Sequence, residues 1–260
     1  MIYTTINASI QAGKQILRIY ERDFNIQTKA DESPLTEADL ASNEVINSFL
    51  KETGVPIISE ENKQLDFFER KGWKKCWIVD PLDGTKEFIK RNGEFTVNIA
   101  LVEEGRPVLG VIYVPVTKEL YYGDVRQGKA WKIKVEDESN VDSLLIEENE
   151  ISPSNKETKD IVRVVGSSSH MNDETMTYVE GLKKEYDTVE IVSKGSSLKF
   201  CLVAEGKADV YPRFAPTMEW DTAAGQAICE SVGLSVIDKG TNAPMLYNRG
   251  NLLNNYFLVQ

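Results

Sequence analysis

Two carboxylates three positions apart, Asp80 and Asp83, are the first residues in the chain with an evident chemical use. They follow the apolar run 77–79, which predicts the end of a buried strand, and Pro81 lacks the N–H that would continue the strand ladder. We therefore expect the chain to turn at Pro81, with residues 84–85 offering backbone N–H groups to an anion. Two hard oxygen ligands beside an anion site indicate Mg²⁺ and a phosphate. The alternative is a plain strand-to-helix turn capped by Asp83.

A site of this kind needs further ligands from other elements. The apolar run 55–58 predicts a strand that ends at Glu60, which repeats the geometry of Asp80. A helix predicted over 36–50 places Asp39 in its first turn, where a carboxylate also stabilises the helix dipole. Asp221 stands at the start of a later helix, and on its own it is explained as an N-cap. These carboxylates gain a chemical meaning only if the fold brings them together.

The predicted elements are ordered differently in the two parts of the chain. Apolar periodicity indicates helices over 2–20 and 36–50, followed by strands with turns at 104–105 and 127–128 that predict an antiparallel meander. The predicted strands of the first part cover residues 55–58, 77–79, 95–102, 110–115, 120–123 and 129–135. In the second part strands over 161–165, 189–192, 209–211 and 256–259 alternate with helices over 174–186, 198–205 and 221–232.

The acidic segment 136–160 is the best candidate for a boundary or an exposed connection. We therefore expect an N-terminal α+β half over residues 1–155, with helices, an antiparallel sheet and most of the metal ligands. A C-terminal α/β half over residues 156–260 would contribute Asp221 and the segments that determine substrate specificity.

The charge balance limits the class of partner. The chain has 30 basic and 41 acidic residues, a net charge of −11, which argues against nucleic acid because affinity for a polyanion rests on Lys and Arg. A phosphate substrate must then be a small molecule whose charge is neutralised locally, and bound metal ions would do this. The sequence makes no prediction of oligomeric state.

The three cysteines, Cys76, Cys201 and Cys229, are far apart and lack metal-ligand spacing. We interpret them as reduced interior thiols, which predicts a reducing compartment, the cytoplasm. The first residues show no basic stretch followed by an apolar one, and no window approaches the roughly 18 consecutive apolar residues of a membrane span. We therefore expect a cytoplasmic protein without a membrane span.

Three segments, taken in order, resemble the signature of the inositol monophosphatase-like, lithium-sensitive phosphatase superfamily. They are Ser-Glu-Glu at 59–61, Asp-Pro-Leu-Asp-Gly-Thr at 80–85 and Trp-Asp-Thr-Ala-Ala-Gly at 220–225. The resemblance covers nearly the whole chain. It implies a layered αβαβα sandwich, the sugar phosphatase fold, which agrees with the mixed α+β and α/β order of the predicted elements.

Further segments resemble one branch of that superfamily, the 3'(2'),5'-bisphosphate nucleotidases. They are Gly-Thr-Lys-Glu-Phe-Ile at 84–89, Asn-Gly-Glu-Phe-Thr-Val-Asn at 92–98, Gly-Ser-Ser-Leu-Lys-Phe-Cys at 195–201 and Tyr-Pro-Arg-Phe at 211–214. The combination is far more specific than any one motif. The segment 195–201 lacks the G-x-x-x-x-G-K-[ST] pattern of a Walker A loop, and its alternative explanation is a helix start with serine caps.

The resemblance implies a cofactor of two or three Mg²⁺ ions. Glu60, Asp80 and the Leu82 carbonyl would hold the first ion, and Asp80 would bridge to a second that is also held by Asp83 and Asp221. The chemistry of the residues agrees with this assignment, because carboxylates clustered in one cleft repel each other unless cations neutralise them.

The resemblance also implies the catalytic residues. Hydrolysis would use a water activated by the two metals, without a phospho-enzyme. The water would be oriented by Thr85, whose hydroxyl pairs with Asp39, or by Glu60, and the N–H groups of Gly84 and Thr85 would hold the phosphate. For Asp39 the competing interpretation is stabilisation of the N-terminus of its helix.

Substrate contacts are implied by the nucleotidase-like segments. Lys199 and Arg213 are candidates for the adenosine side or a second phosphate, which suits a guanidinium. Ser168 and His170 lie in the segment expected near the nucleotide, and the alternative for His170 is a plain surface loop. His170 is the only histidine and has no surrounding motif, so we discount a Ser-His-Asp triad and a phosphohistidine. Gly195 and Ser196 complete the predicted substrate contacts.

The sequence thus predicts a phosphatase that converts adenosine 3',5'-bisphosphate to AMP and phosphate, with 3'-phosphoadenylyl sulfate as a candidate second substrate and with inhibition by lithium. The first alternative is an inositol phosphate or sugar phosphate phosphatase, because the metal site would contact only the phosphate. A second alternative, from a different class, is a non-catalytic nucleotide-binding protein, which the complete set of carboxylates disfavours.

Overall fold

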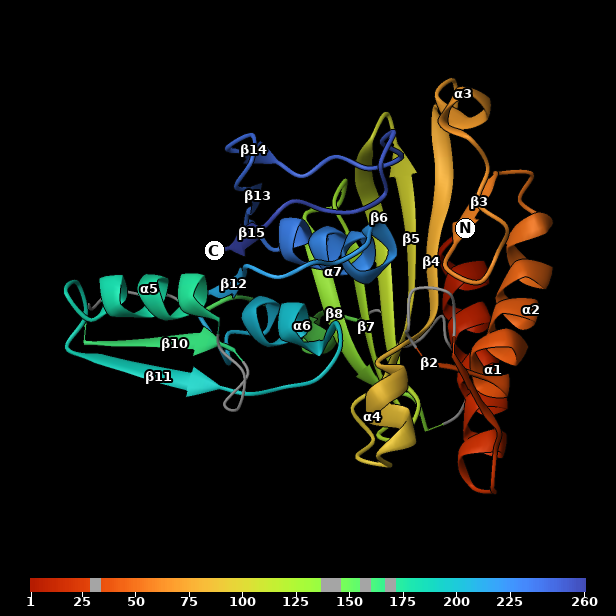
Figure 1. Ribbon diagram of the computed structural model, residues 1–260, viewed down its shortest axis with the longest axis horizontal. Coiled ribbons are helices and arrows are strands. Elements are labelled where there is room, and N and C mark those ends of the chain that lie inside the picture. Colours follow the sequence, from red (N-terminus) through yellow and green to blue (C-terminus); the bar gives the residue numbers. More distant parts are fainter. Residues whose placement is uncertain (29–33, 137–145, 155–159, 167–171) are drawn as a thin grey trace.

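The computed structural model describes residues 1–28, 34–136, 146–154, 160–166 and 172–260. Its elements form layers that run from the helices α1 and α2, through a large sheet, to α5 at the opposite end (Figure 1). The layers alternate as α, β, α, β and α, so the predicted αβαβα sandwich is confirmed.

Two helices form the first layer. α1 spans Ile2–Tyr20 and α2 spans Glu37–Lys51, as the apolar periodicity predicts, and each buries the stripe that faces the sheet. Thr36 is the N-cap of α2, and its backbone N–H and its hydroxyl both donate to the Asp39 carboxylate, at 2.8 and 2.6 Å. A short hairpin of β1 (Ile26–Thr28) and β2 (Pro34–Thr36) precedes this cap.

In the described part of the chain, the large sheet has seven strands in the order β3-β4-β5-β6-β7-β8-β9. β3 pairs with β4 in parallel, and the other neighbours are antiparallel. The predicted meander from β5 to β8 is confirmed, with backbone of positive φ at Glu104, Gly105 and Gly128 in its turns. The strands are β3 (Ile57–Ser59), β4 (Lys75–Asp83), β5 (Thr96–Glu103), β6 (Arg106–Val114), β7 (Glu119–Asp124), β8 (Lys129–Lys134) and β9 (Glu150–Ile151). Short helices α3 (Phe67–Arg70), α4 (Thr85–Ile89) and η2 (Glu147–Asn149) connect them.

The strand β4 differs from its prediction. The strand continues past Asp80 to Asp83, so the expectation that Pro81 ends it was wrong. Asp80 lies opposite Asn98 and Asp83 opposite Thr96, so β4 has one more residue than β5 across this stretch and forms a bulge. Pro81 is tolerated because the parallel pairing with β3 has already ended at Ser59, so no ladder partner requires its missing N–H.

The third layer covers the other face of the sheet with α6 (Leu198–Ala204) and α7 (Glu219–Ser231). α7 lies close to β6 because Gly110 has no side chain, and a Cβ there would collide with the carbonyl oxygen of Ala224. The helix starts before Asp221, which is its third residue, so the interpretation of Asp221 as an N-cap was wrong. The helix thus begins two residues earlier than predicted, and these two residues, Glu219 and Trp220, are both buried.

The remaining layers come from the rest of the second part of the chain. β10 (Ile161–Val165) and β11 (Thr188–Val192) form a parallel pair, and α5 (Asp173–Leu182) covers them. A four-stranded sheet has the order β12-β15-β13-β14, and the Val165 N–H joins the two small sheets through the Val210 carbonyl at 2.8 Å. The strands of this sheet are β12 (Tyr211–Arg213), β13 (Val236–Asp238), β14 (Ala243–Pro244) and β15 (Phe257–Val259).

Three apolar clusters fill the spaces between layers. Trp77 and Val79 point toward α1 and α2, whereas Cys76 and Ile78 point toward α6 and α7. This explains why β4 is a continuous apolar run, because both faces of a central strand are buried. A smaller cluster around Val162 lies beneath α5.

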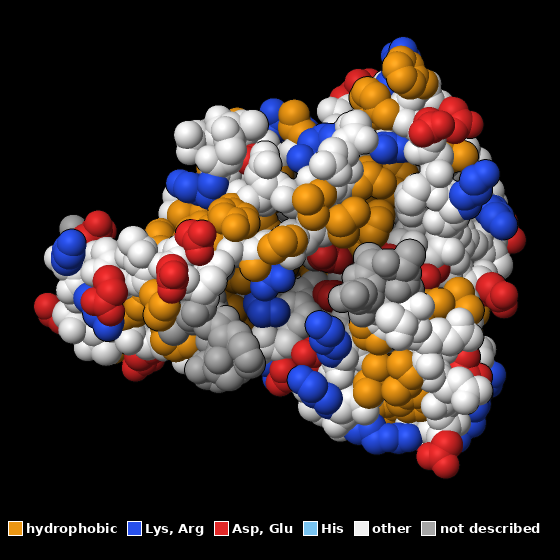
Figure 2. Space-filling model, in the orientation of Figure 1, with side chains coloured by type: hydrophobic (Ala, Val, Ile, Leu, Met, Phe, Trp, Pro, Cys, Tyr) orange, Lys and Arg blue, Asp and Glu red, His pale blue; other side chains and the backbone are white. Residues whose placement is uncertain are grey.

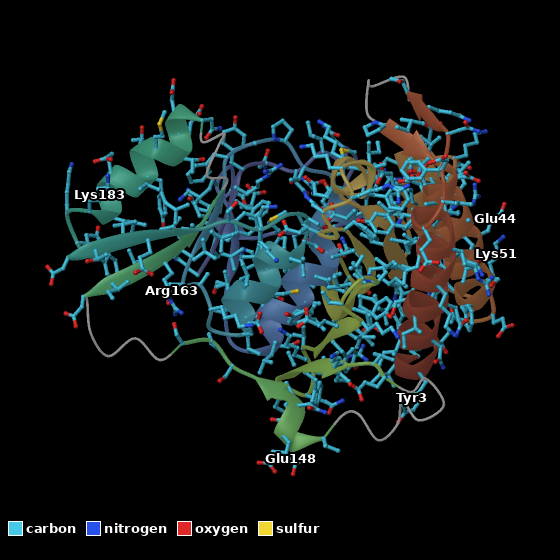
Figure 3. The ribbon with its side chains drawn as sticks, turned by 90° about the horizontal axis from the view of Figure 1, so that it is seen from below. Tyr3, Glu44, Lys51, Glu148, Arg163 and Lys183 are labelled. Carbon is cyan, nitrogen blue, oxygen red and sulfur yellow. The ribbon has the colours of Figure 1, made fainter. Side chains whose placement is uncertain are left out.

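The proposed division at residue 155 stays a prediction. Part of the acidic segment 136–160 lies outside the described residues, and β9 within it adds an edge strand to the large sheet. α7 of the second half packs on strands of the first half, so the two halves share one apolar core. Seen from below, Lys51 of α2 and Lys183 of α5 mark the opposite ends of the layered stack (Figure 3). None of the described helices is long and apolar enough to cross a membrane.

Candidate active site

The register of β3 and β4 brings Glu60 beside Asp80. Ser59 lies opposite Val79 in the parallel pair, and the Glu60 N–H donates to the Val79 carbonyl at 3.1 Å. Because parallel strands end at the same edge of a sheet, the two carboxylates leave the sheet together. On the α2 side, the Ser42 hydroxyl donates to the Pro81 carbonyl at 2.6 Å and holds the bulge in place.

Asp80 is the most buried of the predicted metal ligands, with 1% of its surface exposed. One of its oxygens accepts the Leu82 N–H at 3.0 Å. Burial raises the pKa of Asp80 well above its usual range, and the carboxylates of Glu60, Asp83, Asp221 and Asp39 raise it further. The other predicted carboxylates therefore lie near enough to Asp80 for their charges to act on it.

This donor set fits Mg²⁺ by its chemistry, because it consists of carboxylate and backbone carbonyl oxygens that carry a large excess of negative charge. In the described part of the chain, no three His, Cys, Asp and Glu side chains are arranged so that they could hold a metal ion. The carboxylates of Asp83 and Asp221 instead accept hydrogen bonds from N–H and O–H groups of the protein.

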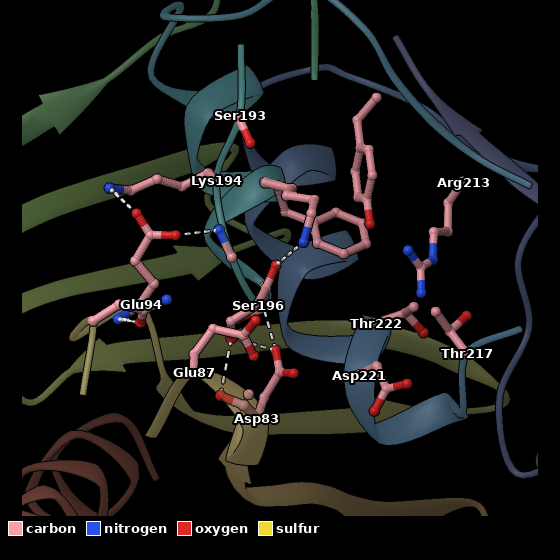
Figure 4. A pocket seen from close by; sticks show the side chains of 17 residues that line it. Asp83, Glu87, Glu94, Ser193, Lys194, Ser196, Arg213, Thr217, Asp221 and Thr222 are labelled. Carbon is pink, nitrogen blue, oxygen red and sulfur yellow. Dashed lines mark hydrogen bonds and ion pairs between the residues drawn. The ribbon is translucent and has the colours of Figure 1, made fainter. Parts of the chain in front are cut away.

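Asp83 is held by the loop before α6. One carboxylate oxygen accepts the Ser196 hydroxyl and the Ser197 N–H, both at 2.6 Å, and lies 3.3 Å from the Asn98 amide nitrogen (Figure 4). The two serine contacts join residues 113 and 114 positions apart in the sequence. They place the Asp83 side chain on the floor of a cavity.

Asp221 faces Asp83 from the first turn of α7. Its carboxylate accepts the Met218 N–H at 2.7 Å, which closes the helix N-terminus. Burial, with the nearby charges of Asp83 and Glu60, raises the pKa of Asp221 to about 8, and the Met218 hydrogen bond opposes this. Asp221 thus closes the first turn of the helix from its third position and also belongs to the carboxylate cluster.

A buried ion pair fixes the start of α7. Glu219 is fully buried, and its carboxylate accepts the N–H groups of Asn248 and Arg249 at 2.7 and 3.1 Å and the Arg249 Nε at 3.0 Å. Burial raises the pKa of Glu219, and the bonds from Arg249 and Asn248 oppose the shift. Because Glu219 precedes Asp221 by two residues, this pair sets the position of Asp221.

Asp39 and Thr85 meet as predicted. The Thr85 hydroxyl donates to Asp39 at 3.1 Å and lies 3.4 Å from the Leu82 carbonyl. The other Asp39 oxygen receives the two donors of Thr36, so Asp39 caps α2 and orients Thr85 at the same time. Both interpretations of Asp39 are therefore compatible with its contacts.

A cavity of about 470 Å³ opens above the carboxylates. Figure 2 shows a hollow on this face with acidic side chains inside it and Lys or Arg side chains beside it. The predicted residues in its lining are Asp83, Gly84, Gly195, Ser196, Lys199, Arg213 and Asp221. Ser168 and His170 lie outside the described residues.

Among the described residues, three basic side chains line this cavity: Lys194 and the predicted Lys199 and Arg213. Lys199 donates to the Ser196 carbonyl at 3.0 Å, and burial lowers its pKa while the Asp83 charge opposes the shift. Arg213 lies on the side of Asp221 and Thr217 (Figure 4) and donates to the Pro216 carbonyl at 3.3 Å. Its buried Nε has no hydrogen-bond partner among the described residues. An unpaired guanidinium N–H next to the cavity is suited to an anionic ligand.

Several residues of the site were not predicted. Glu94 accepts the Gly195 N–H at 2.7 Å and Lys194 at 3.0 Å, and Thr96 and Asn98 contact the serines that hold Asp83. Thr96 and Asn98 alternate with apolar residues along a buried strand, which is a usable signal because buried polar groups need partners. Glu94 gives no such signal.

The carboxylate cluster should make the chelator-treated protein less stable as pH rises. The folded protein keeps a proton on Asp221 up to about pH 8, whereas the unfolded chain loses it near pH 4, so folding stability falls between these values. Asp221→Asn, which cannot ionise there, should flatten the pH dependence by at most about 1.4 kcal/mol per pH unit. Urea midpoints from pH 5 to 8 measure this, and Mg²⁺ should restore the wild-type midpoint at pH 8. Parallel curves for the two proteins would contradict the assignment.

Comparisons with known proteins identify the family of the chain. The model of the inositol monophosphatase family matches residues 1–257. The chain is 47% identical to the 3'(2'),5'-bisphosphate nucleotidase CysQ of Salmonella typhimurium, and the match covers 87% of this chain and 86% of the relative. It is 44% identical to CysQ of Escherichia coli K12, and this match covers 95% of this chain and 94% of the relative. The crystal structure of CysQ from Bacteroides thetaiotaomicron superposes with a TM-score of 0.84 at 50% identity, covering 99% of this chain and 95% of that one. The chain belongs to the inositol monophosphatase family.

Proposed function

We propose that this protein is a Mg²⁺-dependent 3'(2'),5'-bisphosphate nucleotidase that hydrolyses the 3'-phosphate of adenosine 3',5'-bisphosphate to give AMP and phosphate. The observation that carries the proposal is the buried cluster of carboxylates around Asp80. Two members of this cluster, Asp83 and Asp221, line a cavity that Lys199 and Arg213 also line. The relatives named as bisphosphate nucleotidases match the chain at 44–47% identity over 87% or more of its length, which supports the substrate class.

The carboxylates are proposed to hold two or three Mg²⁺ ions, which would activate a water and neutralise the phosphate. Glu60, Asp80 and the Leu82 carbonyl would form one site. Asp80 would be shared with a second site made by Asp83 and Asp221. The raised pKa values of Asp80 and Asp221 support this, because a cation would relieve the repulsion that raises them.

Thr85 is proposed to orient the attacking water. Its hydroxyl hydrogen is donated to Asp39, so the Oγ1 lone pairs are left to accept a hydrogen bond from the water. Asp39 is fixed in turn by Thr36, which makes the arrangement rigid. Glu60 is the alternative group for this role. The N–H groups of Gly84 and Thr85 are proposed to hold the phosphate at the start of α4.

The second phosphate and the nucleoside are proposed to lie against Lys199 and Arg213. The unpartnered Nε of Arg213 supports this, as does the lowered pKa of Lys199, since a phosphate would favour the charged form of the lysine. Gly195 and Ser196 line the same wall, and contacts from Ser168 and His170 stay predictions.

3'-Phosphoadenylyl sulfate, which carries the same 3'-phosphate, is proposed as a second substrate, and lithium as an inhibitor.

A cytoplasmic location is proposed as well. It rests on the three thiols of Cys76, Cys201 and Cys229, which are buried and unpaired. Free interior thiols are typical of proteins in reducing compartments.

Substrate preference tests the proposal directly. We expect kcat/KM for adenosine 3',5'-bisphosphate to exceed that for inositol 1-phosphate by about a hundredfold or more, because only the nucleotide offers a second phosphate to Lys199 and Arg213. Phosphate release should be measured for both substrates with Mg²⁺, with adenosine 3'-monophosphate as the matched substrate that lacks the second phosphate. A preference for inositol 1-phosphate would overturn the substrate assignment and favour the inositol phosphatase alternative.

Replacing Thr85 tests the water-orienting role. Thr85→Ala should lower kcat by about a hundredfold with little change in KM, because the lost hydroxyl acts on the water rather than on the bound substrate. Thr85→Ser keeps the hydroxyl and should retain most of the activity. An unchanged kcat in Thr85→Ala would remove Thr85 from this role.

A further inference from the structure

We infer that Ser196 and Ser197 are positioning residues that fix the Asp83 carboxylate in one orientation for metal binding. The inference rests on the proposed function only in that it requires a divalent cation at Asp83. It changes the role predicted for Ser196, which the sequence assigns to substrate binding.

The two serines act on a single carboxylate oxygen. Asp83 Oδ2 accepts the Ser196 hydroxyl and the Ser197 N–H, each at 2.6 Å. The other oxygen of Asp83 points across the cavity floor toward Asp221 (Figure 4). The loop therefore engages one oxygen of the carboxylate and leaves the other directed at the proposed metal site. Short hydrogen bonds to an ionised carboxylate are strong, so they restrict the rotation of the side chain.

The backbone of the loop is adapted to this task. Ser196 has a φ of +53°, a conformation that residues other than glycine seldom adopt. In this conformation its hydroxyl and the next N–H reach the same oxygen. The preceding Gly195 packs against Glu94, where a Cβ would lie 2.9 Å from the Glu94 Cβ, and its N–H donates to the Glu94 carboxylate. Glu94 thus holds the start of the loop and Asp83 holds its end.

A second row of buried hydroxyls supports the serines. The Thr96 hydroxyl lies 2.7 Å from the Ser196 hydroxyl and 2.8 Å from that of Ser197, and Ser197 donates to the Asn98 side-chain oxygen at 2.8 Å. Thr96, Asn98 and Ser197 are all almost fully buried. A buried network in which each group has a partner is rigid, so the serines cannot move without disrupting it.

The single hydroxyl hydrogen of Ser196 distinguishes a positioning role from a substrate-binding role. A serine hydroxyl has one hydrogen, and at Ser196 the shortest acceptor is Asp83. The same hydrogen cannot be donated to a substrate. The Ser196 carbonyl also accepts a hydrogen bond from Lys199 at 3.0 Å, so the hydroxyl hydrogen and the carbonyl of this residue are both engaged by the protein.

The test measures metal binding without any nucleotide. Ser196→Gly removes the hydroxyl but keeps the backbone conformation, because glycine adopts positive φ readily. Loss of a hydrogen bond behind a metal ligand typically weakens metal affinity by about 10–100-fold. We expect the Kd for Mn²⁺, measured by electron paramagnetic resonance of the free ion, to rise about tenfold. An unchanged Kd together with a raised KM for the nucleotide would overturn the inference and restore the substrate-binding role.

Two further variants act as controls. Ser196→Ala should weaken Mn²⁺ binding as much as Ser196→Gly does. The measurement can therefore still be made if one of these two variants does not fold. Ser193→Ala alters the same cavity wall, and within the described residues Ser193 makes no bond to Asp83, so its Kd for Mn²⁺ should equal that of the wild type. If Ser193→Ala lost as much affinity for Mn²⁺ as Ser196→Gly does, the inference would be overturned. Because no nucleotide is used, the result stands even if adenosine 3',5'-bisphosphate proves not to be the substrate.

Discussion

Electrostatic repulsion among the carboxylates around Asp80 is the constraint on which the site depends. Asp80 is almost fully buried, and four other acidic side chains raise its pKa beyond the effect of burial. Such a cluster destabilises the folded chain at neutral pH unless positive charge enters it. The surrounding structure reduces the repulsion by giving Asp39, Asp83 and Asp221 hydrogen-bond donors, and a divalent cation would remove the rest of it.

Each carboxylate is held by a different part of the fold. The parallel pairing of β3 and β4 places Glu60 beside Asp80, and the bulge of β4 turns Asp83 toward the loop before α6. Asp221 comes from α7, which Glu219 and Arg249 fix at its first turn. The elements α2, β4, α6 and α7 therefore converge on the carboxylate cluster, which forms only when all of them have packed. This explains why metal binding and folding stability should be coupled in this protein.

Local patterns in the sequence predicted the helices α1 and α2, the meander and the carboxylates at the ends of strands. They did not predict that β4 continues through Pro81, because the bulge depends on the register of β5. The buried ion pair of Glu219 depends on Arg249, 30 residues later, and Glu94 acquires its role only through contact with Gly195, 101 residues later. The proposed metal ligands lie in local motifs that can be recognised in the sequence, whereas the groups that hold these carboxylates come from long-range contacts.

The most direct test of this account is Mg²⁺-dependent phosphate release from adenosine 3',5'-bisphosphate by the wild type and by Asp80→Asn. We expect the wild type to release phosphate only with Mg²⁺ and the variant to be slower by about a thousandfold, because the ligand shared by both proposed metal sites is lost. The variant should remain folded, with an unfolding midpoint in chelator at least as high as that of the wild type, because one repelling charge is removed. Turnover by Asp80→Asn at the wild-type rate would contradict the account.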